Sequence, residues 1–372
     1  MSMSDSKYLV IGNSAAAIPA VEAIRELDPD SPLTLVTKED VHTYSRPLIS
    51  YWLGGEVDDS QMNYRPADFY ERYGVKAMLG TKVVGVDPEG RTVETAGGDT
   101  LGFKKLLIAT GGSPIVPPNV EGSDAEGVFT LTAWEHARAI REYLDAHEVE
   151  QAVVVGGGLI GLKATEALVE LGLGVTVVEL ADRILAATFD QTASRLAEEQ
   201  LRSVGVEPLC ENTVSTIRAA DGRVCGVTLQ DGRDMDAQMV VFAIGVTPNV
   251  DLVRDTAIDV DRGILVDDHM QSTVEDIYAA GDVAQARHLL TGERQVVPIL
   301  PNAARQGTIA GRNMAGEEAS FEGAVPMNSV DICGLPTISV GETDPEDAGW
   351  ECLTRLDEKK PSYRKLVLRD GR

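Results

Sequence analysis

The feature that most constrains this chain is a glycine-rich turn between a strand-like and a helix-like stretch. Residues 151–155 form a short apolar run rich in valine. The pattern G-x-G-x-x-G follows at once, with its glycines at Gly156, Gly158 and Gly161. A helix-like stretch comes next, and then a second strand-like run that ends in Glu179. This strand–turn–helix–strand order is the context in which the pattern indicates a dinucleotide site.

The residue types of this unit suit a nucleotide, although a plain glycine turn between packed elements is the alternative. Glycines permit a tight turn and let the backbone approach a pyrophosphate at the N-terminus of the helix. Glu179 lies where a carboxylate accepts hydrogen bonds from an adenosine ribose and repels the extra phosphate of NADP, which favours NAD(H) over NADP(H). Arg183, four residues further on, is a candidate contact for the 2′-phosphate of NADP(H). The candidate NAD contacts are Gly156, Gly158, Leu159, Ile160, Gly161, Glu179 and, in a later turn, Gly245.

A second, less regular copy of the same unit opens the chain. A strand-like run ends at Ile11, Gly12 follows, and Ser14 and Ala17 stand where the second and third glycines would be. A helix-like stretch, a second strand-like run and the acid Glu39 complete the copy. A strand followed by Gly-x-Ser is also the shape of a hydrolase nucleophile elbow, but that elbow has a second glycine and normally follows several strands.

Three later strands end in small residues. They run into Ala109-Thr110-Gly111, Ala243-Ile244-Gly245 and Gly281-Asp282. Each alone reads as an ordinary strand–turn boundary. A carboxylate after the third strand suits the hydroxyl chain of a flavin. Because each motif is weak alone, their order along the chain is the stronger indication of function.

In this order the motifs resemble the flavoproteins with two dinucleotide-binding domains, the FAD- and NAD(P)H-dependent pyridine nucleotide–disulfide oxidoreductases. The resemblance covers roughly residues 7–345. The segment 44–50, Tyr-Ser-Arg-Pro-Leu-Ile-Ser, is similar to one in the branch without the disulfide: NADH–rubredoxin reductases, oxygenase-type ferredoxin reductases and the flavin part of nitrite reductase. The segments 303–307 and 313–316 resemble the helix that closes the flavin site there.

The resemblance implies roles at FAD for fifteen residues. Asp282 would hold the ribityl chain, and backbone N–H groups of Asn302 and Ala303 would face the flavin ring and stabilise negative charge on it. Glu39 would hold the adenosine ribose of FAD. The full set is Gly12, Ser14, Ala15, Ala16, Glu39, Arg46, Pro47, Val83, Ala109, Thr110, Gly111, Gly281, Asp282, Asn302 and Ala303.

Three departures from the family pattern shape the expected chemistry. The stretch 42–50, where disulfide reductases carry C-x-x-x-x-C, has no cysteine, so electrons would leave the flavin directly. Lys163 stands where relatives often have Glu, and is either a candidate catalytic residue near the nicotinamide or a surface lysine. Tyr51 stands where ferredoxin reductases have Lys.

Composition excludes several classes of protein. The chain has 33 Lys plus Arg against 59 Asp plus Glu, a net charge of −26, which disfavours nucleic acid as a partner. Its four cysteines stand singly, which argues against a disulfide framework and a metal site. No apolar run reaches the length of a membrane span, and the start lacks the features of a signal peptide. We therefore expect a cytoplasmic protein.

The expected fold is α/β: two Rossmann-like three-layer domains plus a partial C-terminal α+β domain. We place the FAD-binding domain at 1–118 and 248–320 and the NAD-binding domain at 119–247, with prolines near both crossings. Residues 321–372 open a C-terminal interface-type domain that we expect to be shortened, or to belong to a longer protein, since a strand and an Asp-Gly turn close the sequence.

The expected activity is that of an FAD-dependent NAD(P)H:acceptor oxidoreductase. NADH would reduce the flavin, which would pass electrons to a one-electron carrier: rubredoxin, ferredoxin or an iron–sulfur subunit. Because such carriers are usually acidic, a local basic patch would be needed. The candidate groups are Lys104-Lys105, Arg138 with Arg141, and Lys359-Lys360 with Arg364-Lys365. The alternatives are an NADH oxidase that uses oxygen, and a low-turnover FAD/NAD-binding sensor or interaction flavoprotein. A homodimer is possible.

Overall fold

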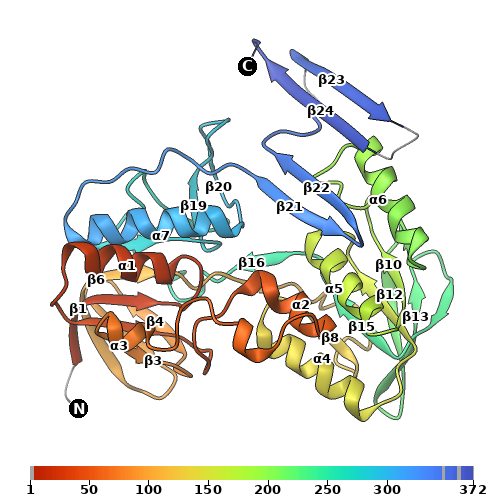
Figure 1. Cartoon of the computed structure of the whole chain (residues 1–372). Helices are drawn as coiled ribbons and strands as arrows, with labels where there is room; N and C mark the ends of the chain where they lie inside the picture. Colours follow the sequence, from red (N-terminus) through yellow and green to blue (C-terminus); the bar gives the residue numbers. More distant parts are fainter. Residues whose placement is uncertain (1–3, 346–347, 358–361, 372) are drawn as a thin grey trace. The chain divides into compact units, whose positions relative to one another are not determined.

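The computed structural model describes residues 4–345, 348–357 and 362–371, and the chain forms two compact units (Figure 1). Each unit is assembled from stretches that lie far apart in the sequence. Unit 1 comprises residues 4–45, Asn63–Ser113 and Thr247–Pro326. Unit 2 comprises Arg46–Met62, Pro114–Val246 and the described residues from Met327 onward.

Unit 1 is built on a seven-stranded sheet. Its parallel part has the order β3-β2-β1-β6, and β18 pairs parallel with the second half of β6. The chain therefore reverses its direction of winding beside β1, which is where open parallel sheets bind ligands at their carboxyl edge. The strands are β1 (Ser4–Ile11), β2 (Leu33–Val36), β3 (Val75–Met78), β4 (Val83–Asp87), β5 (Thr92–Thr95), β6 (Thr100–Ile108) and β18 (Ile277–Ala279).

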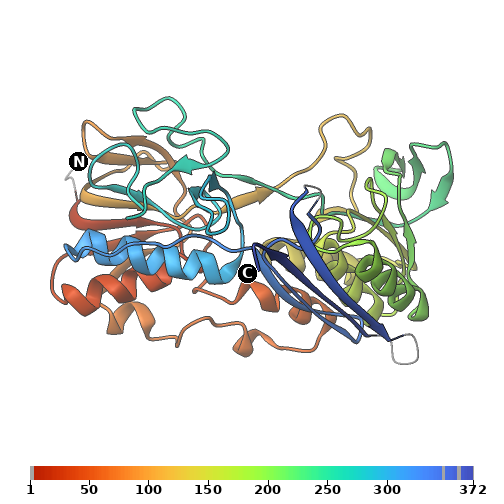
Figure 2. The ribbon, with the colours of Figure 1, turned by 90° about the horizontal axis from the view of Figure 1, so that it is seen from above.

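Two helices of unit 1 lie side by side, α1 (Ala17–Leu27) and α7 (Leu300–Ala315), as Figures 1 and 2 show. Pro19 lies in the first turn of α1, where its missing N–H costs no helical hydrogen bond. The unit also contains a small three-stranded sheet and a short helix. These elements are β17 (Ile264–Leu265), β19 (Ala284–Arg287), β20 (Arg294–Gln295) and α3 (Phe69–Arg72).

Unit 2 is built on a five-stranded, fully parallel sheet of order β11-β10-β9-β15-β8. Its central strands are runs of buried valines, the pattern expected where both faces of a sheet are covered. Again the winding reverses, here between β9 and β15. The strands are β8 (Val128–Thr130), β9 (Gln151–Val155), β10 (Gly174–Val178), β11 (Glu207–Leu209) and β15 (Met239–Phe242).

Helices and an antiparallel sheet surround this parallel sheet. Helix α4 spans Trp134–Ala146 and buries Trp134, Ala137, Ile140 and Tyr143. The helices are η1 (Arg46–Leu48), α2 (Ile49–Gly54), η2 (Asp59–Gln61), α4 (Trp134–Ala146), α5 (Leu159–Glu170) and α6 (Gln191–Ser203). The antiparallel strands are β12 (Val214–Ala220), β13 (Arg223–Leu229) and β14 (Asp234–Asp236). Two further strands, β7 (Gly112–Pro114) and β16 (Val246–Pro248), lie where the chain passes between the units at 113/114 and 246/247.

The described residues after Met327 form two β-hairpins of unit 2. In the second hairpin, β24 pairs antiparallel with β23, and Asp370 and Gly371 follow in a turn. The strands are β21 (Met327–Ile332), β22 (Leu335–Val340), β23 (Trp350–Asp357) and β24 (Ser362–Arg369).

Two stretches fall in a different unit from the one their sequence position suggests. We expected one continuous first piece up to residue 118, but Arg46–Met62 belongs to unit 2. The reason is local packing, because the Trp52 ring meets the edge of Trp134 on α4 and Arg141 donates to the carbonyl of Leu53 at 3.1 Å. The residues after Met327 likewise group with unit 2 rather than by themselves.

Candidate nucleotide sites

The first candidate site begins at Gly12, directly after β1. A Cβ placed on Gly12 would lie 2.2 Å from the carbonyl oxygen of Ala109 at the end of β6, and the φ of Gly12 is +125°. Its N–H donates to the carbonyl of Val36 at 2.8 Å, so the loop is pinned to β2 as well. Only glycine fits this position, because a side chain would meet backbone that cannot move aside.

The rest of this loop is held by Asn13, a residue that the sequence analysis did not single out. Asn13 is buried, its amide donates to the carbonyl of Val41, and its Oδ1 accepts from the Tyr70 hydroxyl at 2.7 Å. Ser14, Ala15 and Ala16 then lead into α1. An asparagine after the first glycine was visible in the sequence, but its partners lie 28 and 57 residues away.

The carboxyl end of β6 is joined to the chain's return crossing by Asn249. Thr110 donates its hydroxyl to the carbonyl of Asn249 at 3.0 Å, and the Asn249 amide donates to the carbonyl of Thr110 at 2.8 Å. Gly111 accepts the N–H of Asn249, while a Cβ on Gly111 would meet no atom within 4 Å. The backbone of Gly111 therefore borders open space, as a cofactor-facing position requires, whereas the Thr110 hydroxyl already has a structural partner.

Gly281 and Asp282 follow β18 and lie beside the start of α7. The N–H of Gly281 donates to Oε1 of Gln306 at 2.8 Å, and a Cβ on Gly281 would lie 3.2 Å from that of Ala16. The loop after β1, the end of β18 and helix α7 therefore meet at one place. Asp282 is half-buried there.

The start of α7 carries the two residues whose backbone N–H groups are predicted to face the flavin, Asn302 and Ala303. Asn302 is the third residue of the helix, so its N–H is one of those that a helix leaves without an internal acceptor. Its side chain is buried and donates to the carbonyl of Val325 at 3.2 Å. The N–H of Ala303 donates to the carbonyl of Ile299 at 3.0 Å, and its contact with the flavin stays a prediction.

The other predicted FAD residues are distributed over both units. In unit 1, Glu39 is half-buried and accepts a hydrogen bond from the Tyr44 hydroxyl at 3.1 Å, and Val83 is buried at the start of β4. Arg46 and Pro47 lie in η1 of unit 2, where the Arg46 guanidinium donates to the carbonyl of Thr132 at 2.8 Å. The structure thus does not bring these two residues together with the others within one unit.

The second candidate site is the loop after β9. Its first glycine, Gly156, makes the same kind of close backbone contact as Gly12, and Gly161 adds another. A Cβ on Gly156 would lie 2.4 Å from the carbonyl oxygen of Ala243, and the φ of Gly156 is +113°. A Cβ on Gly161, in the first turn of α5, would lie 1.9 Å from the carbonyl oxygen of Gly156. Gly158 differs, since a Cβ there would meet no atom within 4 Å. Leu159 and Ile160 begin α5, so this open position lies at a helix N-terminus.

Glu179 closes this loop from the end of β10. Its Oε2 accepts the N–H of Gly157 at 2.5 Å and its Oε1 accepts the N–H of Ala181 at 2.8 Å. The carboxylate is therefore oriented against the glycine loop, where an adenosine ribose would meet it. Gly245, after β15, lies in the same unit and its carbonyl accepts the N–H of Ile115 at 3.0 Å.

Lys163 is already paired within unit 2, and one of its neighbours is the other departure from the family pattern. The ammonium forms an ion pair with Glu166 and lies 4.4 Å from the centre of the Tyr51 ring, with the hydroxyl 3.4 Å away. Burial lowers the pKa of Lys163, but its bonds to Glu166 and Tyr51 outweigh this, so the pKa is raised. Lys163 therefore stays charged and tethered to α2. Its predicted role near a nicotinamide stays a prediction.

Two of the four cysteines have raised thiol pKa values. Burial raises the pKa of the Cys210 thiol to about 11 and that of the Cys333 thiol to about 11, so both are protonated at neutral pH. All four cysteines are free thiols. Among the described residues no group of three or more His, Cys, Asp or Glu side chains could hold a metal ion. In the same part of the chain no helix is long and apolar enough to cross a membrane.

Two parallel sheets, each with a glycine loop at its winding reversal and an acid after its second strand, define a class: oxidoreductases with two dinucleotide-binding domains in one chain. The family described as pyridine nucleotide-disulphide oxidoreductase matches residues 6–307, and the chain belongs to this family. The two glycine loops both lie inside the matched range.

Several relatives resemble the chain over nearly its whole length. It is 36% identical to the NADH-dependent phenylglyoxylate dehydrogenase subunit epsilon of Aromatoleum evansii, over 97% of this chain and 85% of that protein. It is 32% identical to nitrite reductase [NAD(P)H] of Bacillus subtilis over 99% of this chain, but this is only 44% of that protein. Among solved structures, an NAD-dependent persulfide reductase from A. fulgidus has a TM-score of 0.87 and 30% identity, covering 98% of this chain and 71% of that one. We therefore classify the chain as an NAD(P)H oxidoreductase.

Proposed function

We propose that the protein is an FAD-dependent oxidoreductase that passes electrons from NADH through the flavin to a one-electron carrier, without a redox disulfide. The observation that carries this proposal is the pair of glycine loops, each at the winding reversal of its own sheet, together with the Glu179 carboxylate, which accepts the N–H of Gly157 in the second loop. One loop would hold each nucleotide.

The residues of unit 1 fit FAD. Gly12 lets the loop pack closely against Ala109, Gly111 borders open space, and the N-terminus of α7 has a proline and no side-chain cap. The unbonded N–H groups and the dipole of that helix stabilise negative charge nearby. Gly12, Ser14, Ala15 and Ala16 would bind the pyrophosphate, Glu39 the adenosine ribose, and Asp282 the ribityl chain. Bound FAD supplies hydride acceptance and single-electron release.

The residues of unit 2 fit NADH. The open position at Gly158 would let a pyrophosphate reach the N-terminus of α5, and Glu179 would accept from the ribose hydroxyls. A carboxylate in this position repels the 2′-phosphate of NADPH, so we propose NADH as the preferred donor. The Lys163 ammonium, paired with Glu166 on α5, also contacts Tyr51 of α2. This contact would hold the two helices together when a coenzyme binds.

Two observations support a protein carrier as the acceptor. The stretch 42–50 has no cysteine and the buried thiols are protonated, so a thiol relay is disfavoured. The Aromatoleum evansii relative is named as a subunit of a dehydrogenase, which favours a partner subunit as the acceptor for this chain. The match to less than half of nitrite reductase is consistent with a module of a larger assembly.

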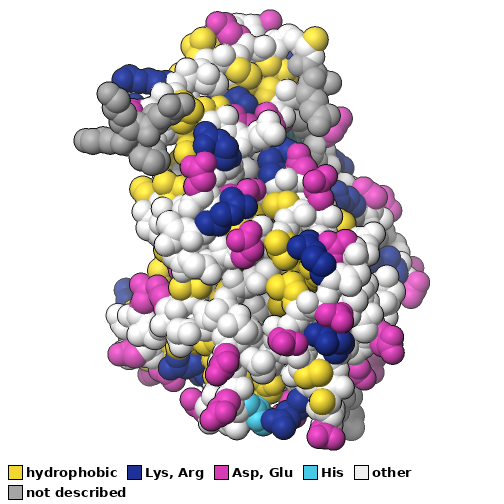
Figure 3. Space-filling model, turned by 90° about the vertical axis from the view of Figure 1, so that its right-hand side faces the viewer, with side chains coloured by type: hydrophobic (Ala, Val, Ile, Leu, Met, Phe, Trp, Pro, Cys, Tyr) yellow, Lys and Arg dark blue, Asp and Glu magenta, His cyan; other side chains and the backbone are white. Residues whose placement is uncertain are grey.

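Two of the predicted basic residues pair with carboxylates. Lys105 pairs with Asp276 at 3.2 Å, and Lys365 pairs with Asp190 at 2.9 Å and Asp344 at 3.2 Å. Lys359 and Lys360 lie outside the described residues. On the face in Figure 3, basic and acidic side chains are interspersed.

The test is anaerobic reduction of the purified, FAD-loaded protein, followed by its visible absorbance. One equivalent of NADH is expected to bleach the flavin rapidly, and NADPH to do so much more slowly. The reduced protein should then reduce rubredoxin or ferredoxin faster than it consumes oxygen. A variant with all four cysteines changed to serine should behave like the wild type.

Other results would reassign the function. Rapid oxygen consumption with no carrier reduction would identify an NADH oxidase instead. Failure of NADH to bleach the bound flavin would leave a binding or sensing flavoprotein. Loss of carrier reduction in the cysteine-free variant would mean that a thiol takes part. A protein that does not retain FAD would contradict the roles proposed for unit 1.

A further inference from the structure

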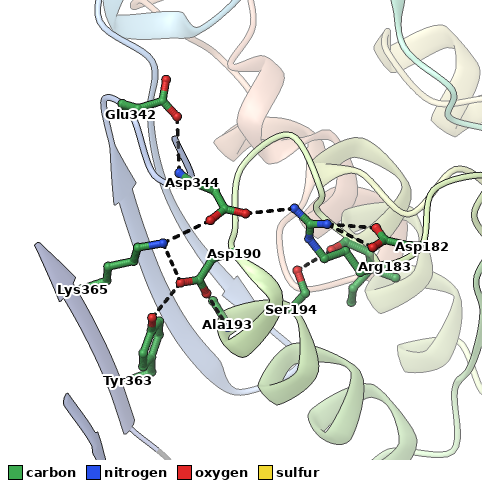
Figure 4. Close-up of polar contacts among 10 residues, drawn as sticks. Asp182, Arg183, Asp190, Ala193, Ser194, Glu342, Asp344, Tyr363 and Lys365 are labelled. Carbon is green, nitrogen blue, oxygen red and sulfur yellow. Dashed lines mark hydrogen bonds and ion pairs between the residues drawn. The ribbon is translucent and has the colours of Figure 1, made fainter. Parts of the chain in front are cut away.

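A series of ion pairs connects the loop after β10, which carries Asp182 and Arg183, to the C-terminal hairpins of unit 2 (Figure 4). Arg183 lies on the loop after Glu179. One of its terminal nitrogens donates to both carboxylate oxygens of Asp182, at 2.9 and 3.3 Å, and the other donates to Asp344 at 3.2 Å. Its side chain is only 21% exposed. Both charged ends of the Arg183 guanidinium are therefore occupied by carboxylates.

Asp344 is itself held in place from the second hairpin. Its Oδ1 accepts from Lys365 on β24 at 3.2 Å, and the same ammonium binds Asp190 at 2.9 Å. Asp190 also accepts from the Tyr363 hydroxyl at 2.6 Å and from the N–H of Ala193 as the N-cap of α6. Burial alone would raise the pKa of Asp190, but these hydrogen bonds lower it overall. Asp344 is thus a fixed carboxylate.

The loop that carries Arg183 touches the candidate ribose site. The N–H of Leu185 donates to the carbonyl of Gly157 at 2.9 Å, and the N–H of Ala181 donates to Glu179 at 2.8 Å. A free cation on such a loop would attract the 2′-phosphate of NADPH. Here Asp182 and Asp344 pair with Arg183, and Glu179 lies at the start of the same loop. Asp190 lies behind them, so four carboxylates face the two cations Arg183 and Lys365.

From this geometry we infer that Asp344 determines coenzyme specificity. By holding Arg183, it denies a 2′-phosphate its cation and adds a negative charge, so the site takes NADH rather than NADPH. Asp344 is a positioning residue, since it acts through Arg183. The inference rests on the proposed function of unit 2 as the NADH site, and it places a determinant 161 residues beyond Arg183, far from the glycine loop and Glu179 in sequence.

The test compares two probes that need no redox chemistry, ADP-ribose and 2′-phospho-ADP-ribose. Their dissociation constants are measured by calorimetry on the FAD-loaded protein, at low and at high salt. Asp344→Asn should bind the phosphorylated probe about threefold more tightly, the size expected for one partly exposed charge, with ADP-ribose unchanged. The gain should shrink at high salt. Adding Asp182→Asn to Asp344→Asn should increase the gain in affinity for 2′-phospho-ADP-ribose further.

Matched variants separate this role from a general effect on stability. Glu351→Gln removes the same charge from an exposed residue of β23 and should change neither constant. Asp344→Glu keeps the charge and should keep the wild-type ratio of the two constants. In an Arg183→Met background, Asp344→Asn should give a smaller gain, because the cation that it releases is gone.

The possible failures are distinguishable. If ADP-ribose does not bind the wild-type protein, both the proposed function of unit 2 and this inference fall. If ADP-ribose binds and Asp344→Asn leaves the ratio of the two constants unchanged, only this inference falls. An equal gain with and without Arg183 would likewise overturn it, because Asp344 would then act without the arginine.

Discussion

The two glycine loops of the chain solve the same problem with glycines in different places. In both, the first glycine passes over a carbonyl oxygen of the neighbouring strand: a Cβ would lie 2.2 Å from that oxygen on Gly12 and 2.4 Å from it on Gly156. In unit 2 the loop's third glycine, Gly161, then lets α5 approach the loop itself. In unit 1 that position is Ala17, and it is fully buried without a glycine.

In unit 1 the glycines that permit a close approach of backbones lie on helix α7. A Cβ on Gly307 would lie 2.0 Å from the carbonyl oxygen of Ala16, and one on Gly311 would lie 2.5 Å from that of Ala20. In unit 1 the close approach is therefore between α1 and α7, which stand near opposite ends of the sequence. A glycine belongs where backbone meets backbone, and which backbone that is depends on the whole unit.

The largest effect should come from Gly156→Ala. The new methyl group would meet the Ala243 carbonyl, and its backbone conformation is unfavourable for alanine, so the two costs together should reach about 3 kcal/mol in the free energy of unfolding. Urea unfolding followed by circular dichroism measures this. Gly12→Ala should cost a similar amount through Ala109, and tolerance of one variant but not the other would break the comparison of the two loops.

Gly158→Ala is the control in the same loop. Its Cβ has open space and its backbone conformation is extended, so the free energy of unfolding should stay near that of the wild type. Binding of ADP-ribose should nevertheless fall, because the methyl group would occupy space that we assign to the pyrophosphate. If Gly158→Ala instead unfolds the protein, the loop is packed against atoms of the protein and not against a coenzyme.

A smaller effect is expected from Gly307→Ala. The methyl group would press on the carbonyl of Ala16, and forcing α1 and α7 apart should cost about 1–3 kcal/mol of unfolding free energy. Retention of FAD on gel filtration should fall as well, since Ala16 borders the proposed pyrophosphate site. Thr308→Ala, on the same helix with only a local hydrogen bond to Ala304, should change both quantities little.

The smallest effect is expected from removing the charge of Glu179 or of Glu39, and each variant should weaken the binding of a different nucleotide. Glu179→Gln loses the charge that binds the N–H groups of Gly157 and Ala181, so ADP-ribose should bind the FAD-loaded protein about tenfold more weakly, or about 1.4 kcal/mol. Glu39→Gln should leave that constant unchanged and weaken FAD binding instead. The opposite assignment, with FAD retention depending on Glu179, would exchange the nucleotides proposed for the two units.

Local sequence was sufficient for the elements that carry the glycine loops. Alternating strands and helices with glycines at their junctions predict parallel sheets, because a right-handed crossover is the only common way to join such strands. The order of the motifs also identified the family, which the match over residues 6–307 confirms. The lack of a cysteine at 42–50 is a fact of composition and needs no fold.

Only the tertiary structure decided which partners those residues have. It assigned Arg46–Met62 to unit 2, tied Lys163 to Glu166 and Tyr51, and engaged the Ala303 N–H with Ile299. It also set Asp344 against Arg183, 161 residues earlier. The physical reason is that helices and strands follow from contacts a few residues apart, whereas side-chain pairs across such separations depend on how the whole chain folds back on itself.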